Sequence, residues 1–185
     1  MKVTDLALPG LKLIEPTYFE DHRGYFCETY SQRTFAEYGI DCLFVQDNHS
    51  MTKYAGTIRG IHCQKEPAAQ GKLVRCTRGR IRDYAVDFRK DSDTYKQWIC
   101  VELSEENRRQ LWIPAGFGHA FLSLVDNCEV QYKATAFYAP DLDCSVLWSD
   151  PEIGIDWGIR EPILSDKDAS AKPLKDCGLN FRVNS

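Results

Sequence analysis

The stretch Arg78-Gly-Arg-Ile-Arg-Asp-Tyr-Ala-Val-Asp-Phe-Arg89 indicates most directly how this chain folds. Its residues alternate in character, with Tyr84, Val86 and Phe88 on one parity and Asp83, Asp87 and Arg89 on the other. A period of two residues predicts a β-strand with one buried face. Gly79 marks the turn that precedes this strand.

Similar short runs recur along the chain between turn residues. They are Leu11–Ile14, Leu43–Gln46, Leu73–Thr77, Ile81–Phe88, Trp98–Leu103, Gln110–Ile113, Ala120–Val125 and Glu129–Ala136. Many short strands at this spacing are typical of an all-β sandwich or barrel. We therefore expect one all-β domain over residues 1–185, because this length suits a single substantial core.

Two segments indicate peripheral helices. Ser31 is a suitable N-cap, Phe35 and Tyr38 share a helical face, and Gly39 supplies a left-handed terminus. We expect this helix to pack against the outside of a sheet. Near the C-terminus, Ser165 is the capping residue of a short helix or irregular cover.

Charge and hydropathy exclude several classes of protein. The formal net charge is −4 and the basic residues are scattered, which argues against binding to nucleic acid by phosphate neutralisation. The N-terminus contains Asp5 and no continuous apolar run, so neither a secretory signal nor a membrane span is predicted. The eight cysteines form no C-x-x-C pair, and we expect reduced, mostly buried thiols in a cytoplasmic protein.

The segment between Arg59 and Lys72 gathers residues suited to chemistry beside an anionic substrate. His62 follows a strand-like Thr57–Ile61, and an imidazole inside a barrel is a usable base near neutral pH. A buried structural histidine is the alternative. With Arg59 and Lys72 close in sequence, we favour the functional interpretation.

Polar residues elsewhere suggest a phosphate and sugar site. Arg23 and Arg59 could clamp a diphosphate, because a guanidinium matches paired phosphate oxygens. A charged surface turn is the commoner role for a residue such as Arg23. Gln46 and Asn48 occupy alternate positions and would reach sugar hydroxyls from one face of a strand.

The segment Pro114-Ala-Gly-Phe-Gly-His119 resembles the second conserved segment of the cupin superfamily. Metal-binding cupins carry His-x-His in their first segment, whereas this chain has His62-Cys63-Gln64. A three-histidine metal site would need His22 or His49. We therefore expect no catalytic metal and no cofactor.

The chain as a whole resembles the dTDP-4-dehydrorhamnose 3,5-epimerase family. The segments that carry the resemblance, in order, are Asp21–Glu28, Gln46–Ser50, Arg59–Gln64, Gln70–Val74, Val86–Arg89, Pro114–His119, Tyr132–Lys133 and Leu164–Asp168. No single motif would justify the family name. The order and spacing of these segments make the resemblance specific.

This resemblance implies a cupin-type jelly roll with a few short helices. It also implies metal-free inversion of the carbons beside the ketone of a nucleotide-linked 4-keto-6-deoxy sugar, with dTDP as the first choice of nucleotide. His62 corresponds to the base, Asp168 to its orienting carboxylate and Tyr132 to the acid on the opposite face of the sugar. Lys72 would place positive charge near the ketone oxygen. The alternative role of Tyr132 is that of a core tyrosine, and the alternative role of Lys72 is that of a solvent-facing strand lysine.

The resemblance also implies substrate contacts and a homodimer. The positions carried over are Arg23, Glu28, Gln46, Asp47, Asn48, Arg59, His119, Asp143 and Lys167. In such a dimer an N-terminal strand would bring Arg23 and Glu28 to the partner's site. The chain departs from the family pattern at Asp143, where the family usually has Glu, and at Cys63 and Ala120 beside the two histidines. These departures affect the choice of sugar, and of C3, C5 or both, more than the class of reaction.

Two other kinds of protein fit part of the pattern. A non-catalytic nucleotide-sugar-binding cupin would use the same arginines without needing His62, Lys72 and Tyr132. A metal-dependent cupin enzyme would lose activity when treated with a chelator. We rank the binding protein second and the metalloenzyme third.

Overall fold

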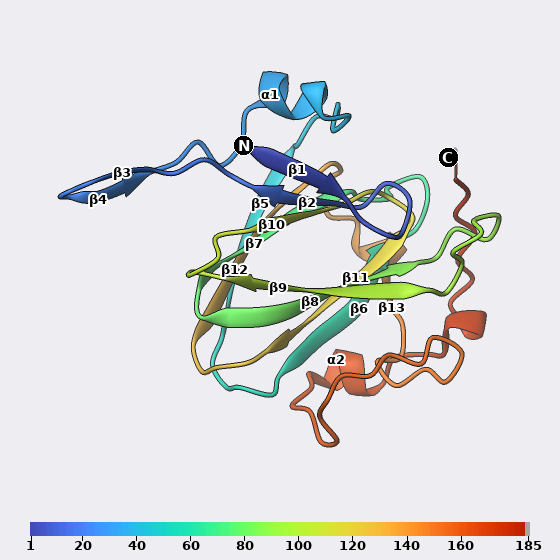
Figure 1. The fold of residues 1–185 in the computed structure, drawn as a ribbon. Coiled ribbons are helices and arrows are strands. Elements are labelled where there is room, and N and C mark those ends of the chain that lie inside the picture. Colours follow the sequence, from blue (N-terminus) through green and yellow to red (C-terminus); the bar gives the residue numbers. More distant parts are fainter. Residues whose placement is uncertain (184–185) are drawn as a thin grey trace.

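A computed structural model describes residues 1–183 and consists mainly of antiparallel strands (Figure 1). The strands are β1 Lys2–Asp5, β2 Lys12–Glu15, β3 Phe19–Asp21, β4 Gly24–Phe26, β5 Gln46–Thr52, β6 Ile58–Gln64, β7 Lys72–Arg78, β8 Arg80–Asp87, β9 Trp98–Ser104, β10 Gln110–Ile113, β11 Phe117–Ser123, β12 Cys128–Ala134 and β13 Asp143–Ser145. The helices are α1 Gln32–Glu37, α2 Asp166–Ala169 and the 3-10 turns Pro140–Leu142 and Leu174–Asp176.

Two sheets face each other and form the body of the molecule. One has the order β1-β2-β10-β7-β12-β5 and the other β13-β6-β11-β8-β9, with all neighbours antiparallel. Neighbouring strands are often distant in sequence, as in a jelly roll, in which the chain crosses between the sheets. The expectation of an all-β jelly roll with short peripheral helices is confirmed.

The main core lies between the sheets. Val74 and Leu111 contribute to it from the six-stranded sheet, and Ile81, Ala85 and Phe121 from the five-stranded sheet. All five are buried, four of them with no exposed surface. Polar residues of the same inward faces, among them Lys72 and His119, line a cavity next to this core.

Strand β8 differs from the expectation of one buried face, because both of its faces are buried. Ile81 and Ala85 point into the main core, while Tyr84 and Phe88 pack in a second cluster under the C-terminal segment. The ring centroids of Tyr84 and Trp157 lie 4.4 Å apart. The prediction was wrong because a cover folded back from residues far along the chain is invisible in the local pattern.

The first predicted helix is present as α1 and lies on the outside of the six-stranded sheet, as expected (Figure 1). Phe35 is buried there with Leu73 and Trp112 in a third cluster. Ser31 occupies the N-cap without a side-chain capping bond, and Gly39 has a φ of +77° just after the helix. Ser165 does cap α2, because its Oγ accepts a hydrogen bond from the Asp168 amide at 3.1 Å.

The predicted strand Leu43–Gln46 is wrong in position. The strand in this region, β5, begins at Gln46 and continues to Thr52. Leu43 is 66% exposed, whereas Phe44 packs against the cluster under α1. The apolar run therefore serves as an outer cover, and the more polar residues that follow it form the strand.

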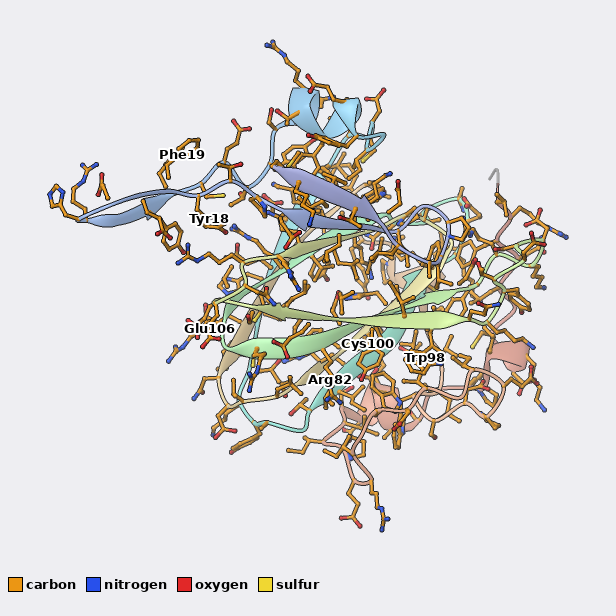
Figure 2. All side chains as sticks on the ribbon, viewed as in Figure 1. Tyr18, Phe19, Arg82, Trp98, Cys100 and Glu106 are labelled. Carbon is orange, nitrogen blue, oxygen red and sulfur yellow. The ribbon has the colours of Figure 1, made fainter. Side chains whose placement is uncertain are left out.

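Strands β3 and β4 form a hairpin that projects from the body, as Figures 1 and 2 show. We call residues 18–28 the arm. Phe19 and Phe26 on the arm are 64% and 69% exposed, and Tyr25 is 59% exposed. The guanidinium of Arg108 lies 4.2 Å from the Tyr25 ring centroid, where the arm leaves the body.

Candidate active site

A cavity of about 460 Å³ lies between residues of the two sheets. Strands β6 and β11 contribute to it from one sheet, β7 and β12 from the other, and the segment around α2 closes one side. Its lining residues are Ser50, Thr57, Ile58, Arg59, His62, Lys72, His119, Phe121, Tyr132, Ile163, Leu164, Ser165, Lys167 and Asp168. Seven of the predicted site residues therefore line one cavity.

Arg59 and His62 both line the cavity although they are three residues apart on β6. In a regular strand an odd spacing places side chains on opposite faces. The pairing of β6 with β11 shifts between His119 and Phe121, opposite Gly60 and Ile61. Gly60 has a φ of +131°, and a Cβ there would lie 2.4 Å from the Ala120 Cβ. Only glycine suits this irregularity, which turns both polar side chains inward.

His62 is paired with Asp168 across the cavity wall. The His62 Nε2 and the Asp168 Oδ1 are 2.5 Å apart. Asp168 is 2% exposed and lies on α2, where the Ser165 cap orients the start of the helix. Burial raises the pKa of Asp168, but the hydrogen bond and charge of His62 outweigh it, so the pKa lies below its ordinary value. An ionised Asp168 fixes the tautomer of His62 and leaves Nδ1 as the nitrogen without a partner.

Lys72 and Tyr132 face the interior from the six-stranded sheet. Lys72 is 9% exposed and makes no ion pair with any of the described residues, and its Nζ lies 5.7 Å from the Tyr132 ring centroid. Burial lowers the pKa of Lys72 and raises that of Tyr132 above 10, with the charge of Asp143 adding to the latter. Tyr132 is therefore a protonated donor at neutral pH, and the Lys72 amine has hydrogen-bonding capacity that no described residue uses.

His119 is a second histidine of the cavity and is held by a second carboxylate. It stands directly opposite His62 in the ladder between β6 and β11. Its Nε2 lies 2.8 Å from the Oδ1 of Asp83, a fully buried residue of β8. The cavity thus contains two histidine–carboxylate pairs side by side.

Arg59 is oriented by the backbone and side chain of β5. Its Nε donates to the Thr52 Oγ1 and its Nη2 to the Met51 carbonyl, both at 3.0 Å. The Nη1 group has no hydrogen bond to the described residues. Arg59 can therefore offer that edge of its guanidinium to an anion at the cavity mouth.

The remaining predicted contacts form a network beside the mouth. Lys167 is ion-paired with Asp143, which also accepts a hydrogen bond from the Tyr138 hydroxyl at 3.3 Å. Gln46 donates to the Asn48 Oδ1 at 2.9 Å. Gln46 and Asn48 share the face of β5 that carries the cavity residue Ser50.

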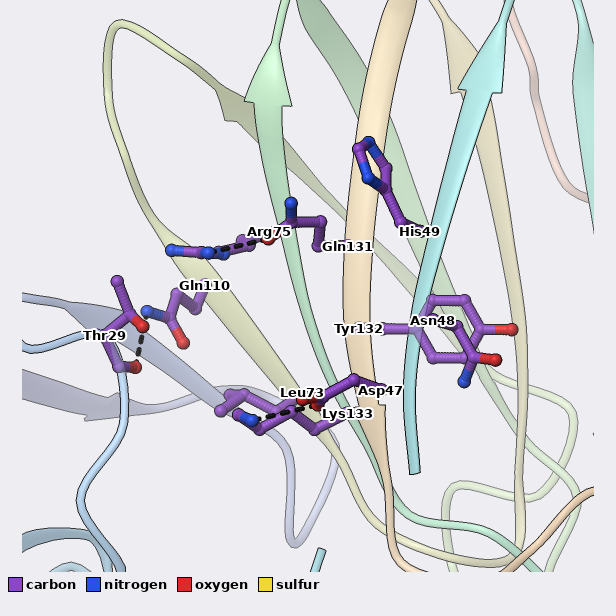
Figure 3. Close-up of a pocket in the computed structure, with 10 residues that line it drawn as sticks. All are labelled: Thr29, Asp47, Asn48, His49, Leu73, Arg75, Gln110, Gln131, Tyr132 and Lys133. Atoms are coloured by element: carbon purple, nitrogen blue, oxygen red, sulfur yellow. Dashed lines mark hydrogen bonds and ion pairs between the residues drawn. The ribbon is translucent and has the colours of Figure 1, made fainter. Parts of the chain in front are cut away.

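Three predicted contacts lie away from this cavity. Arg23 and Glu28 are on the exposed arm, and among the described residues Arg23 is hydrogen-bonded only to Asp21. Asp47 has the opposite parity on β5 and is ion-paired with Lys133 at 2.9 Å. Figure 3 shows this pair in a separate pocket of about 320 Å³.

Sequence reasoning missed two buried residues that hold site side chains. Thr52 bonds Arg59, and Asp83 bonds His119. The alternation placed Asp83 on the charged parity of a strand with one buried face, and the tertiary structure shows that this parity points into the main core. For Thr52, no local pattern distinguishes it from an ordinary strand threonine.

The cysteines of the described part of the chain are mostly buried, as expected. All eight are free thiols, and Cys63, Cys76, Cys128, Cys144 and Cys177 are buried. Between residues 1 and 183, no group of three or more His, Cys, Asp or Glu is arranged to hold a metal ion. No helix of this region is long and apolar enough to cross a membrane.

Comparison with known proteins identifies the family. Residues 5–176 match the family model described as dTDP-4-dehydrorhamnose 3,5-epimerase. The enzyme of that name from Salmonella typhimurium is 50% identical, with 97% of this chain and 98% of the relative covered. That from Methanothermobacter thermautotrophicus is also 50% identical, with 92% of each covered.

Solved structures agree in fold over nearly the whole chain. The dTDP-6-deoxy-D-glucose-3,5-epimerase of Legionella pneumophila, in complex with dTDP-4-keto-L-rhamnose, has a TM-score of 0.93 and 41% identity, covering 100% of this chain and 99% of that one. A 3′-monoepimerase from Streptomyces bikiniensis in complex with dTDP-quinovose has a TM-score of 0.85 and 36% identity, covering 92% and 86%. By sequence and by fold, this chain belongs to the dTDP-4-dehydrorhamnose 3,5-epimerase family.

Proposed function

We propose that this protein epimerises dTDP-4-dehydro-6-deoxy-D-glucose at C3 and C5 to give dTDP-4-dehydro-L-rhamnose. The observation that carries the proposal is the convergence of the His62–Asp168 pair with Lys72 and Tyr132 from the opposite sheet on one cavity. The names of close relatives and the ligand of the Legionella pneumophila structure support the same substrate class.

The chemistry requires a base, an anion-stabilising group and an acid. A C–H beside a ketone is a weak acid, so His62 would accept its proton through Nδ1 while Asp168 stabilises the imidazolium. Lys72 would stabilise the enolate oxygen that develops. Tyr132 would return a proton to the opposite face of the sugar ring, which one histidine cannot do. This series of proton transfers is redox-neutral and includes no metal or organic cofactor.

Binding of the nucleotide would use the residues around the mouth. Arg59 has a free edge for a diphosphate oxygen, and Gln46, Asn48, Lys167 and Asp143 supply hydrogen-bonding groups beside it. Asp143, which is shorter than the Glu usual in the family, already binds both Lys167 and Tyr138. Lys167 is therefore the member of the Lys167–Asp143 pair that would turn to a ligand.

Proton exchange tests the function directly. Chelator-treated protein is incubated with dTDP-4-keto-6-deoxyglucose in deuterium oxide, and deuterium at C3 and C5 is followed by NMR. Incorporation at both carbons is expected, and His62→Ala should abolish it. Incorporation at C3 alone would identify a monoepimerase such as the Streptomyces bikiniensis relative. Tight binding without exchange would contradict the proposal and favour a non-catalytic cupin.

We propose further that the protein is a homodimer in which the arm completes the partner's site. Support comes from the exposed aromatic residues of the arm and from Arg23, whose only hydrogen-bond partner between residues 1 and 183 is Asp21. Complementation tests this: Arg23→Ala and His62→Ala subunits are mixed after each is shown to be inactive. If Arg23 serves the partner's site, the mixed dimer has one intact site, and random mixing restores about a quarter of wild-type activity. No restoration in proven mixed dimers would contradict it.

A further inference from the structure

Asp83 is an acidic residue inside an otherwise apolar part of the core. It lies on the inward parity of β8 between Ile81 and Ala85, and it has no exposed surface. Within residues 1–183 its only hydrogen bond is to His119, and its Oδ2 has no partner there. An ionised carboxylate in such surroundings costs free energy unless it is fully paired, so stability does not explain its presence.

The bond to Asp83 determines what His119 can offer a ligand. An ionised carboxylate only accepts hydrogen bonds, so the His119 Nε2 must carry a hydrogen. Nδ1 makes no hydrogen bond to the described residues and is the remaining polar atom of a ring that lines the cavity. His119 stands directly opposite His62 in the ladder between β6 and β11, and both side chains line the same cavity. The Nδ1 of His119 is therefore placed to act on the same ligand as His62.

Asp83 also acts on Lys72, another basic group of the cavity. Burial holds the pKa of Lys72 below its ordinary value, and the negative charge of Asp83 is among those that oppose this shift. One buried carboxylate therefore stabilises positive charge on Lys72 and orients His119. Both are groups that could donate to an oxygen that becomes negative during the reaction.

Asp87 provides a contrast on the same strand and the same parity. It too has no exposed surface, but it accepts hydrogen bonds from Arg89, Ser92 and Thr94. Its partners account for its burial in structural terms. Asp83 has no comparable set of hydrogen-bond donors within residues 1–183.

We propose that Asp83 is a positioning residue of the reaction, which holds His119 through Nε2 so that Nδ1 acts on the bound sugar beside Lys72. This inference rests on the proposed epimerase function. It assigns the second histidine–carboxylate pair a share in stabilising the enolate, while the His62–Asp168 pair handles the proton.

The test compares Asp83→Asn with the matched variant Asp87→Asn in kcat, KM and thermal unfolding. Asp83→Asn should lower kcat on the order of 10- to 100-fold, as when a carboxylate that orients a functional histidine is lost. KM should change less than about threefold, and the unfolding temperature should stay equal or rise, because an incompletely paired buried charge disappears. Asp87→Asn should lower the unfolding temperature and leave kcat within about twofold, because it leaves the buried Arg89 without its charge partner.

A double-mutant cycle isolates the route of the effect. In a His119→Gln background, Asp83→Asn should lower kcat by less than about threefold further, because a residue that acts through His119 has nothing left to position. A kcat of Asp83→Asn near wild type, or a full further loss in the double variant, would overturn the proposal. So would a fall in unfolding temperature that accounts for the lost activity.

A readout independent of turnover separates this proposal from the proposed function. Ring ¹⁵N shifts of His119 should show hydrogen on Nε2 in the wild type and a mixture of tautomers in Asp83→Ala. If wild-type protein shows no exchange at C3 or C5, the proposed epimerase function fails. The tautomer measurement still tests whether Asp83 positions His119. An unchanged His119 tautomer in Asp83→Ala would overturn the positioning role whatever the substrate.

Discussion

Asp168 and His62 are separated by 106 residues in sequence, yet their side chains meet at 2.5 Å in the wall of the cavity. The contact depends on a helix of only four residues, whose cap at Ser165 places Asp168 against β6. The Gly60 amide also approaches the Asp168 Oδ2, at 3.5 Å. The base is therefore oriented by a segment that belongs to the cover of the sheet and not to the sheet itself.

Replacing Asp168 by Asn should lower kcat by about 10³- to 10⁴-fold with little change in KM, because the amide favours the wrong tautomer of His62. The pKa of Asp168 is lowered in the folded protein. Its contribution to stability is therefore fully present above the unfolded value of about 3.9 and is lost as pH falls through the folded value. Unfolding temperatures of wild type and variant should differ at pH 7 and converge in strong acid; a constant difference would contradict this assignment.

Lys72→Met should lower kcat by about 10²- to 10³-fold, because the enolate loses its nearby positive charge. The same substitution should not lower the stability of the fold. The pKa of Lys72 is lowered by burial, so its charged form destabilises the fold below that pKa, and wild-type stability rises as pH increases through it toward 10.5. Denaturant unfolding should find Lys72→Met at least as stable as wild type at pH 7, with the gap narrowing at alkaline pH. A variant that is inactive because it is unfolded would refute this.

Tyr132→Phe should spare deuterium exchange more than completed inversion, because His62 still removes the proton while its return to the opposite face is lost. Burial raises the pKa of Tyr132, so the phenol is protonated throughout the neutral range and should cause no loss of rate below pH 10. Exchange and net inversion are measured on the same sample by NMR. Equal loss of both would contradict the division of labour between the two residues.

Gly60→Ala should destabilise the protein by about 1–3 kcal/mol and reduce activity, because its Cβ would overlap Ala120 and straighten the irregular part of β6. Gly24 has a similar φ of +129° but meets nothing within 4 Å, so Gly24→Ala reports the cost of backbone strain without overlap. Urea unfolding of both variants separates the two terms. Similar losses would show that overlap with Ala120 is not the cause.

Several features followed from local sequence. Alternation identified β7 to β10 within a few residues, and Gly79, with a φ of +76°, forms the predicted turn. The helix after Ser31 and the capped turn at Ser165 also lie where expected. These features are set by neighbours in sequence, which is why pattern alone reveals them.

Other features depend on contacts between distant segments. The burial of both faces of β8 and the inward direction of Asp83 require the C-terminal cover. The common direction of Arg59 and His62 requires a shift in pairing with β11, against the rule of alternation. The homodimer, the roles of Arg23 and Glu28 and the division of catalytic roles stay predictions.

The sequence by itself determined the class of fold, the family and most of the residues that meet in the cavity, because alternation, turn chemistry and the order of motifs are written along the chain. Only the tertiary structure decided which faces are inside, how Arg59 and His62 come to point the same way, and which carboxylates hold the two histidines. Those outcomes depend on register and cover, which arise when residues from 36 to 106 positions apart pack together and which no local pattern encodes.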